Sequence, residues 1–321
     1  MRGVGAVRSK SWLVLVAALV VPFSLGVNAD AAPREAAAPL LAPALAPAAT
    51  AATAATASCD PTKSVRPSLD ESGPAVSAIK RRGVLIAGVD QNSYRWGFRD
   101  PQTGELQGFD IDLVHAVAKA ILGDPNKVEF KTVPTDQRIN AIKSGEVDLI
   151  ARTMSITCDR LNDVAFSSAY FEAGQQVVVP RSAKATTIDQ ALKGKTVCVA
   201  DSSTAQTELK SNQHGAATVK VVGNQLDCLV LMQLGQVDAT MTDNALAVGQ
   251  AAQDPTVQVI GPSLTAEPYG IAMAKGATDL VARVNQVLED YRGNGWQASY
   301  DKWLGPYLGP SNGPPPADYL P

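Results

Sequence analysis

Cysteine and histidine, the residues that most often bind metal ions or act as nucleophiles and bases, are few in this chain of 321 residues. The cysteines and histidines are Cys59, Cys158, Cys198, Cys228, His115 and His214. No two cysteines form a Cys-x-x-Cys pair, so the sequence does not favour a zinc site. One histidine falls in a predicted helix and the other in a predicted loop, and neither is placed as the base of a nucleophilic site. We therefore expect no catalytic residue, no metal and no cofactor.

The N-terminus has the layout of a secretory signal peptide. Arg2, Arg8 and Lys10 precede an uncharged apolar stretch from Trp12 to Val27, and an Ala-x-Ala pattern ends at Ala31. The apolar stretch is shorter than the roughly 20 residues that span a bilayer, which favours a signal peptide over a membrane anchor. We predict that residues 1–31 are a signal peptide and that the protein is exported, either secreted or associated with the cell wall or membrane. In an oxidising compartment four cysteines are expected to form two disulfides.

Two segments have compositions that do not support a packed fold. Between residues 29 and 58, 16 of 30 residues are alanine and 4 are proline, so residues 32–58 are expected to form an extended, disordered spacer. The tail Gly309–Pro321 carries five prolines and is expected to be loose.

The formal net charge is −3 and aromatic residues make up 5%, which excludes a nucleic-acid-binding protein.

The rest of the chain alternates strand and helix patterns, which must position any functional side chains. A short apolar run, Gly83–Asp90, is typical of a buried parallel strand. Apolar residues then recur at helical spacing in 111–122, with Asp110 as the predicted N-cap and Gly123 as the terminating residue. A strand, a helix and a strand are predicted next, at 128–133, 136–144 and 147–151. This order predicts a parallel sheet covered by helices.

The same layout occurs a second time along the chain. The run Gly194–Asp201 parallels Gly83–Asp90, since each is an apolar strand that ends in an aspartate. Segments 139–149 and 229–239 also match, because each reads as a helix followed by a strand. The two offsets differ, which predicts two similar α/β lobes of unequal length rather than a tandem repeat. Ligands bind at the carboxyl ends of strands in such sheets, so a cleft is expected between the lobes.

The division into lobes bears on the disulfides. Four cysteines allow three connectivities. Cys198 and Cys228 fall in the same predicted lobe, which favours their pairing. The remaining pair, Cys59–Cys158, would tie the start of the folded chain to the first lobe. On the loop-entropy model each disulfide stabilises the fold by roughly 3–4 kcal/mol.

Several motifs follow one another along the chain: Gly108-Phe109-Asp110-Ile111-Asp112-Leu113, Thr153-Met154-Ser155-Ile156-Thr157-Cys158-Asp159-Arg160, Phe166-Ser167-Ser168-Ala169-Tyr170, Pro268-Tyr269-Gly270-Ile271-Ala272 and Asn294-Gly295-Trp296. In this collinear order they resemble the polar amino-acid-binding proteins of ABC importers, solute-binding family 3. Within the family, the chain looks most like the actinobacterial glutamate- and aspartate-binding proteins, which the four cysteines and the segment Cys59-Asp60-Pro61-Thr62 fit.

The resemblance implies the two-lobed α/β fold of type 2 periplasmic binding proteins. Lobe 1 would comprise residues 59–170 and 265–321, and lobe 2 residues 175–262. Two crossing strands, near Glu172-Ala173 and Thr265-Ala266, would form the hinge. The resemblance further implies a monomer that captures an acidic amino acid by cleft closure and delivers it to the membrane permease of an ABC importer.

The family's ligand loop has the pattern Thr-x-Thr-x-Thr-x-x-Arg, which this chain matches with Ser155 in the middle position. The resemblance implies that Arg160 grips the α-carboxylate of the ligand, for which a planar bidentate donor is the natural partner. Ser155 would add backbone and hydroxyl donors, and the Thr153 carbonyl would accept from the α-ammonium group.

The resemblance assigns three contacts to lobe 2. Ser203 and Thr204 match the helix start that touches the same carboxylate from the opposite side. Asp243 matches the acid that pairs with the α-ammonium group. The structural alternative is that these residues merely cap helices, a common role for serine and aspartate.

The resemblance implies that the side chain of the ligand binds to an arginine. Arg138 matches the residue that acidic-amino-acid binders use for the distal carboxylate, with an ordinary helix-surface arginine as the alternative. Arg95 and Arg152 also lie near the predicted cleft and could share this role. Asp90 occupies a position that holds an acid or a cation in relatives, and it is included among the candidate contacts. Glutamine binders of the family usually place an aromatic residue near Thr135, and none stands there. We therefore expect glutamate or aspartate as the ligand, with asparagine and glutamine also considered.

Two other functions stay open at this point. The protein could be an amino-acid sensor that presents its ligand-bound state to a membrane signalling partner. The fold also occurs in dehydratases of aromatic amino-acid synthesis, so fold alone does not choose between binding and catalysis. If the protein were an enzyme, Glu172 near the hinge is the acid expected to act.

Overall fold

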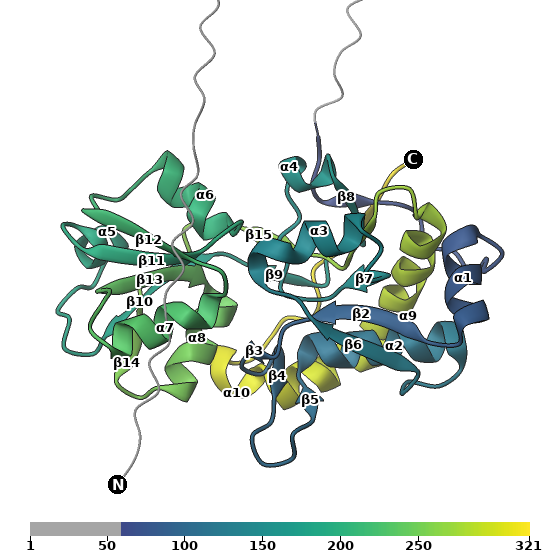
Figure 1. The fold of residues 1–321 in the computed structure, drawn as a ribbon, viewed down its shortest axis with the longest axis horizontal. Coiled ribbons are helices and arrows are strands. Elements are labelled where there is room, and N and C mark those ends of the chain that lie inside the picture. The colour runs from purple at the N-terminus through teal and green to yellow at the C-terminus, as the bar shows by residue number, and fades with distance from the viewer. Residues whose placement is uncertain (1–58) are drawn as a thin grey trace, which may run out of the picture. The chain divides into compact units, whose positions relative to one another are not determined.

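The computed structural model describes residues 59–321, which form the two-lobed body in Figure 1. The predicted signal peptide (1–31) and spacer (32–58) lie outside the described residues. Within 59–321, no helix is long and apolar enough to cross a membrane. Each lobe is built on one five-stranded sheet, which confirms the two-lobed α/β prediction.

The sheet of lobe 1 has the strand order β6-β2-β7-β16-β8. Strand β2 (Leu85–Val89) pairs in parallel with β6 (Val128–Thr132) and β7 (Leu149–Ile150). Strand β16 (Ala272–Ala274) runs antiparallel to both β7 and β8 (Val164–Phe166). Strand β2 is almost wholly buried, as its unbroken apolar run predicts.

Helices cover both faces of this sheet. Helices α1 (Pro74–Arg82), α2 (Phe109–Leu122) and α9 (Thr278–Trp303) share one apolar cluster with β2. Helix α3 (Arg138–Lys143) packs into a second cluster. Because successive strand residues point to opposite faces, neighbouring residues of β7 enter different clusters.

Helix α2 begins at Phe109, two residues earlier than predicted. Gly108 takes the N-cap position, and Asp110 lies inside the first turn instead of capping it. The reason is that backbone carbonyls of Arg95 and Trp96 already accept from the first N–H groups of the helix, so no side-chain cap is needed. The helix ends as predicted at Gly123, which adopts a φ of +75°.

The sheet of lobe 2 repeats the topology of lobe 1, with the strand order β12-β11-β13-β10-β14. Strand β11 (Thr196–Ala200) pairs in parallel with β12 (Thr218–Val222) and β13 (Ala239–Asp243). Strand β10 (Gln175–Pro180) runs antiparallel to β13 and β14 (Val257–Ile260). In both lobes three parallel strands are followed by an antiparallel strand that continues from the hinge.

Helices also cover both faces of the second sheet. Helices α5 (Ile188–Leu192) and α6 (Thr204–Ser211) contribute to one apolar cluster. Helices α7 (Gln225–Gln233) and α8 (Asn244–Gln253) contribute to the other. The lobe therefore has a three-layer arrangement, with the sheet in the middle.

The chain crosses between the lobes twice, through strands β9 (Phe171–Ala173) and β15 (Glu267–Tyr269). These two strands pair antiparallel with each other, and Glu267 lies opposite Ala173. Strand β9 leads into β10, and β15 leads back into β16. The expected hinge segment Glu172-Ala173 lies in β9, and the other, Thr265-Ala266, directly precedes β15.

Short elements complete the described chain. They are β1 (Lys63–Ser64), β3 (Asn92–Ser93), β4 (Gly97–Arg99), β5 (Leu106–Gln107), a 3-10 turn (Thr135–Gln137), α4 (Cys158–Leu161), α10 (Gly305–Leu308) and β17 (Asp318–Tyr319). Strand β17 belongs to the tail at 309–321, which was expected to be loose.

That expectation for the tail is wrong. Strand β17 pairs in parallel with β1, and the Leu320 N–H donates to the Ser64 carbonyl at 2.8 Å. The Arg292 guanidinium of α9 also donates to the Pro315 carbonyl. Proline favours an extended backbone and loses only a donor, so a proline-rich segment can still lie along a lobe and bond through its carbonyls.

Two disulfides are present, in the pairing that the sequence favours. They are Cys59–Cys158 and Cys198–Cys228, with Cα–Cα distances of 5.8 and 5.5 Å. The first joins the start of the described chain to helix α4, and the second joins β11 to α7 inside lobe 2. No cysteine within 59–321 is free.

Candidate functional site

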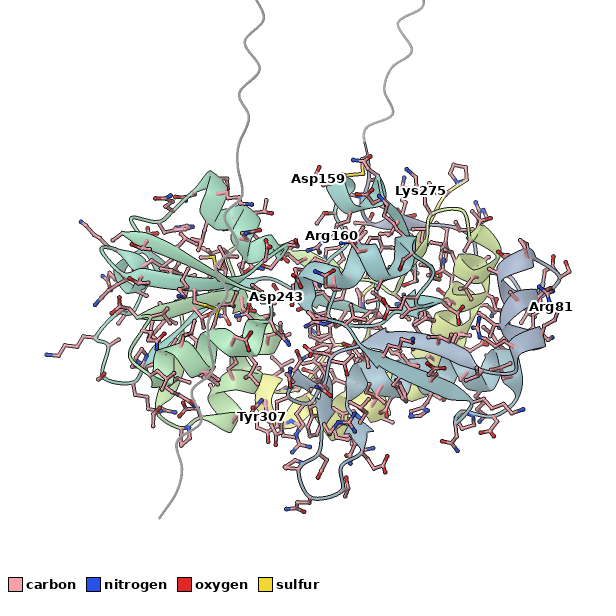
Figure 2. The ribbon with its side chains drawn as sticks, viewed as in Figure 1. Arg81, Asp159, Arg160, Asp243, Lys275 and Tyr307 are labelled. Atoms are coloured by element: carbon pink, nitrogen blue, oxygen red, sulfur yellow. A yellow bond between two sulfur atoms is a disulfide. The ribbon has the colours of Figure 1, made fainter. Side chains whose placement is uncertain are left out.

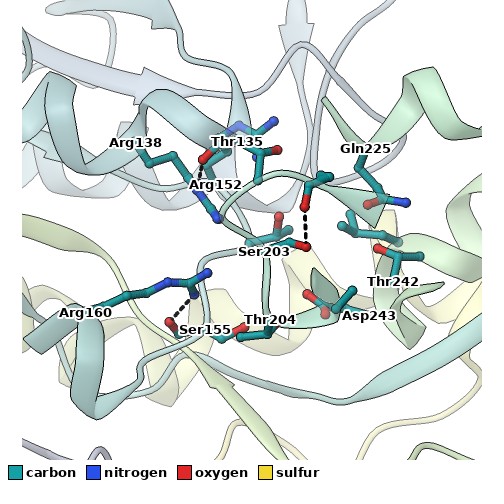
Figure 3. Close-up of a pocket in the computed structure, with 14 residues that line it drawn as sticks. Thr135, Arg138, Arg152, Ser155, Arg160, Ser203, Thr204, Gln225, Thr242 and Asp243 are labelled. Atoms are coloured by element: carbon teal, nitrogen blue, oxygen red, sulfur yellow. Dashed lines mark hydrogen bonds between the residues drawn. The ribbon is translucent and has the colours of Figure 1, made fainter. Parts of the chain in front are cut away.

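A polar pocket lies between the lobes, where loops follow the carboxyl ends of the parallel strands. Its lining residues are Thr135, Arg138, Arg152, Thr153, Ser155, Arg160, Ala200, Ser203, Thr204, Ala205, Gln225, Thr242, Asp243 and Leu246. Figure 2 shows Arg160 and Asp243 on opposite sides of the junction between the lobes. Figure 3 shows the polar side chains of both lobes gathered around this pocket. Of the eight predicted ligand contacts, all except Asp90 line it.

Two buried arginines of lobe 1 have no acidic partner within the described residues. Arg160 is 9% exposed, and it donates to the carbonyls of Ser155 at 2.7 Å and Ser202 at 2.9 Å. Arg138 is 4% exposed, and it donates to the carbonyls of Thr135 at 2.9 Å and Ser202 at 3.2 Å. Burial lowers the pKa of both guanidinium groups, and the positive charge of Arg160 lowers the pKa of Arg138 further.

The Ser202 carbonyl is thus an acceptor that lobe 2 offers to two cations of lobe 1. Its backbone has a φ of +57°, in the left-handed region that a residue with a side chain seldom adopts. Neutral carbonyls accept hydrogen bonds from a guanidinium but do not cancel its charge, and a carboxylate is the stronger acceptor. The pocket is therefore arranged to receive anionic groups.

Arg152, the third arginine, is already neutralised. Its guanidinium lies 2.9 Å from the Asp90 carboxylate, and both side chains are almost fully buried. It also donates to the Asn224 side chain of lobe 2 at 3.1 Å. Asp90 further accepts from the Ser93 hydroxyl at 2.6 Å. The structure therefore places Asp90 behind Arg152 instead of in the pocket, so it positions an arginine.

Arg95 does not share the ligand site either. Its guanidinium lies 4.8 Å from the centre of the Tyr94 ring and 5.6 Å from that of Tyr307. It donates to the Tyr307 hydroxyl at 3.4 Å. This aromatic surrounding holds the cation at the edge between α10 and the loop before β4, away from the pocket lining.

The ligand loop of lobe 1 is fixed by Asp110, which the sequence analysis predicted to be a helix N-cap. Asp110 accepts from the Thr153 N–H at 3.0 Å and from the Tyr170 hydroxyl at 2.7 Å. Thr153 has a φ of +43°, so this backbone needs outside support. Burial raises the pKa of Asp110 to about 7. The signal in the sequence that could have identified this role was the position of Asp110 in the first turn of the predicted helix.

Arg160 lies on a single helical turn. Helix α4 is four residues long, and the Thr157 side chain caps it by accepting from the Arg160 N–H at 3.2 Å. The Cys59–Cys158 disulfide attaches to the first residue of this turn. Cap, disulfide and the bond to the Ser155 carbonyl together fix the direction of the guanidinium.

The wall of lobe 2 begins at the N-terminus of α6. The Ser203 hydroxyl accepts from the Gln206 N–H at 3.1 Å and donates to the Ala200 carbonyl at 2.6 Å, so it serves as the helix cap. Thr204, the first residue of the helix, donates from its hydroxyl to Glu267 at 2.7 Å. Both residues line the pocket.

Asp243 ends strand β13 and takes the N-cap position of α8. It is 7% exposed, and its carboxylate accepts from the Gln175 side-chain amide and the Tyr269 hydroxyl. Burial, followed by the negative charge of Glu267, raises the pKa of Asp243 to about 7. A nearby cation such as an ammonium group would stabilise its charged form.

Sequence reasoning missed Glu267 and selected Glu172 instead. Both acids lie on the hinge strands, but Glu172 is exposed whereas Glu267 is 8% exposed and faces the pocket residues. Side chains alternate between the faces of a strand, so the register of β9 with β15 decides which acid is buried. That register depends on the packing of the two lobes and has no local signal in the sequence.

The comparisons with known proteins agree with this architecture. Residues 85–306 match the family described as bacterial extracellular solute-binding proteins, family 3. The ABC transporter glutamine-binding protein GlnH of Bacillus subtilis is 34% identical over 74% of this chain and 87% of its own length. The glutamate-binding protein GluB of Corynebacterium efficiens is 28% identical over 74% of this chain and 83% of its own length. The expected special likeness to glutamate binders is therefore not supported.

The solved structures give the same result. The solute receptor for L-cysteine of Neisseria gonorrhoeae has a TM-score of 0.69 to this chain and 31% sequence identity. The match covers 73% of this chain and 95% of the receptor. These relatives are binding proteins and not enzymes, in agreement with the expectation of no catalysis. The chain belongs to the bacterial extracellular solute-binding proteins of family 3.

Proposed function

We propose that this protein is an exported binding protein that captures an acidic L-amino acid and delivers it to the permease of an ABC importer. Support for the amino-acid class comes from the two ends of the pocket. Arg160 offers a buried bidentate donor for an α-carboxylate, and Asp243 faces it with a carboxylate for an α-ammonium group. The relatives, which include proteins named as glutamine- and glutamate-binding, support the same class.

The acidic side chain is inferred from Arg138, and this observation carries the proposal. Two pocket arginines lack an acidic partner among residues 59–321, whereas Asp243 is the one acid in the lining. Glutamate and aspartate carry two carboxylates and one ammonium group, the complementary set. The buried Thr135 hydroxyl and Arg152 Nε have no hydrogen-bond partner within the described chain, and both lie in the lining beside Arg138. They supply further polar contacts for a distal carboxylate.

Glutamine is the second candidate, because the Bacillus relative is named as a glutamine-binding protein. A side-chain amide could accept from Arg138 through its oxygen, but it would leave the buried charge without a counter-ion. Arginine, lysine and histidine would bring a second cation to this end of the pocket. On electrostatic grounds we rank glutamate and aspartate first, then glutamine and asparagine, and cationic amino acids last.

Calorimetric titration of the purified protein against all twenty amino acids tests the proposal. Tightest binding of glutamate or aspartate is the expected result. If glutamine or asparagine binds more tightly than either acid, the assignment of Arg138 to a distal carboxylate is wrong while the α-amino-acid site stands. If no amino acid binds, the assignment of the pocket as an amino-acid site is wrong.

A further inference from the structure

Glu267 is a buried acid that does not itself line the pocket. It is the first residue of hinge strand β15, and its side chain is 8% exposed. The hinge strands join the lobes, so this carboxylate stands at the back of the cleft with pocket residues of both lobes in front of it. A buried carboxylate has to be neutralised or fully hydrogen-bonded. How Glu267 achieves this determines what the pocket presents to a ligand.

Four donors saturate the Glu267 carboxylate. The hydroxyl groups of Ser155 and Thr204 both donate to Oε2 at 2.7 Å, and they come from opposite lobes. Gln175 donates from its side-chain amide to Oε1 at 2.8 Å, and the Thr265 hydroxyl donates to the same atom at 2.9 Å. Four short bonds match the roughly four acceptor sites of an ionised carboxylate.

These bonds settle the direction in which two pocket hydroxyl groups can act. A hydroxyl has one hydrogen and two lone pairs. Because Ser155 and Thr204 give their hydrogens to Glu267, only lone pairs remain for a ligand in the pocket. Both hydroxyl groups therefore accept hydrogen bonds from the ligand and do not donate to its carboxylate.

We propose that Glu267 is a positioning residue that creates the ammonium subsite by orienting the hydroxyl groups of Ser155 and Thr204. This inference rests on the proposed function and deepens it. An ammonium group has three N–H donors. The carboxylate of Asp243 and the two oriented hydroxyl oxygens provide three acceptors, and Glu267 accepts from both hydroxyl groups. The hydroxyl of Ser155 thus serves the ammonium end of the ligand, in contrast to the role that the resemblance implied.

The charges around Glu267 favour a cation at this place. Asp243 adds negative charge near it, and the hydroxyl of Tyr269 donates to Asp243. The charge of Asp243 is felt by both Arg160 and Arg138, and both guanidinium groups are directed to backbone carbonyls. The ammonium group of the ligand would therefore bind near the two buried acids, Asp243 and Glu267, and the α-carboxylate of the ligand would bind to Arg160.

The substitution Glu267→Gln tests the proposal, with Glu172→Gln as the matched control on the other hinge strand. A glutamine at 267 keeps the shape but brings N–H donors, so a hydroxyl in front of it turns its hydrogen toward the ligand. Calorimetry should compare glutamate with glutarate, and glutamine with glutaramate, since each pair differs only by the ammonium group. We expect Glu267→Gln to weaken glutamate and glutamine at least tenfold and to change glutarate and glutaramate by less than threefold. Glu172→Gln should leave all four unchanged.

A double variant provides a second readout. If Glu267 acts through Thr204, the loss of glutamate affinity in Glu267→Gln with Thr204→Val will be smaller than the product of the two single losses. Equal weakening of ligands with and without the ammonium group, or multiplicative losses in the double variant, would overturn the inference while leaving the proposed function intact. Wild-type protein that binds none of these amino acids would overturn the proposed function, and the inference with it. Circular dichroism and thermal unfolding check that each variant is folded.

Discussion

At the residue scale, the pocket separates its charges in an unusual way. Arg152 has its own carboxylate in Asp90, whereas Arg138 and Arg160 are buried against carbonyls. A buried cation without a counter-ion destabilises the protein until an anion arrives. An anionic ligand that pairs with these two arginines removes this destabilisation, and the free energy gained contributes to binding. Substitutions at Arg138 and Arg160 should therefore be the most informative.

Replacing Arg138 by glutamine is the direct test of side-chain specificity. Loss of a buried charge partner should weaken glutamate or aspartate by about 2–4 kcal/mol, roughly thirtyfold to a thousandfold. Glutamine and asparagine should lose much less, because their amide groups need no counter-ion. Calorimetry of acidic and neutral ligands on one preparation makes the comparison independent of folding defects. Equal losses for both kinds of ligand would mean that Arg138 supports the fold and not the selection.

Asp243 should make binding depend on pH. With a pKa of about 7 in the ligand-free protein, its carboxyl group is largely protonated below that pH. An ammonium group pairs with the carboxylate, so binding must expel this proton, and affinity should fall as the pH drops, approaching tenfold per pH unit at the steepest. Affinity should level off near pH 8 and stay constant until the ammonium group of the ligand itself begins to lose its proton. Asp110 has a similar pKa but does not line the pocket.

Calorimetry in buffers of different ionisation enthalpy measures the proton directly. Close to one proton should be released per glutamate bound at pH 6, and almost none at pH 8. Binding without proton release at pH 6 would show that the ligand ammonium group is not placed against Asp243.

At the element scale, the main point is how little secondary structure holds the carboxylate clamp. Arg160 stands on the four-residue helix α4, which is far too short to be stable alone. The disulfide Cys59–Cys158 anchors this turn, whereas Cys198–Cys228 closes a much shorter loop inside lobe 2. The two disulfides should therefore differ in what their loss costs.

Replacing both cysteines of one disulfide by alanine tests this difference. The separations are 99 and 30 residues, for which loop entropy predicts losses of about 4.7 and about 3.6 kcal/mol in the free energy of unfolding. Urea unfolding of the two double variants measures the order. Only the Cys59/Cys158 variant should also lose glutamate affinity, because only that bond attaches to the turn bearing Arg160. A larger loss of stability in the Cys198/Cys228 variant would contradict the loop argument.

Elements built from local patterns could be predicted from the sequence, and those that depend on long-range packing could not. The apolar run of β2 and the helical spacing of α2 predict their structures because each pattern has a period of its own. Of the seven predicted residues that line the pocket, Thr153, Ser155 and Arg160 lie in one of the collinear motifs, and the other four were assigned one position at a time from the resemblance. Glu267 and Asp110 were missed as site residues because their partners lie far away in the chain, at Ser155 and Thr153. The proline-rich tail was mispredicted because its pairing partner, β1, lies more than two hundred residues away.

At the scale of the whole molecule, the two lobes bring opposite charges to one pocket. Lobe 1 supplies Arg160 and Arg138, and lobe 2 supplies Asp243. A ligand that carries both a carboxylate and an ammonium group can link the lobes, whereas a ligand with one kind of charge gains contacts mainly on one side. Closure is stabilised only by the difference in affinity between the closed and open forms. An α-amino acid should therefore favour the closed form much more than its deamino analogue does.

Small-angle X-ray scattering tests this prediction on the full protein. Saturating glutamate should decrease the radius of gyration, because it bonds to Arg160 on one lobe and Asp243 on the other. Glutarate, which lacks the ammonium group, should leave the radius of gyration close to the ligand-free value even at concentrations where it binds. Arg160→Ala should abolish the response to glutamate, since removing one partner of a buried charge pair costs about 2–5 kcal/mol and cuts the link to lobe 1. If glutarate compacts the protein as fully as glutamate does, closure depends on the carboxylates alone, and Asp243 has no part in joining the lobes.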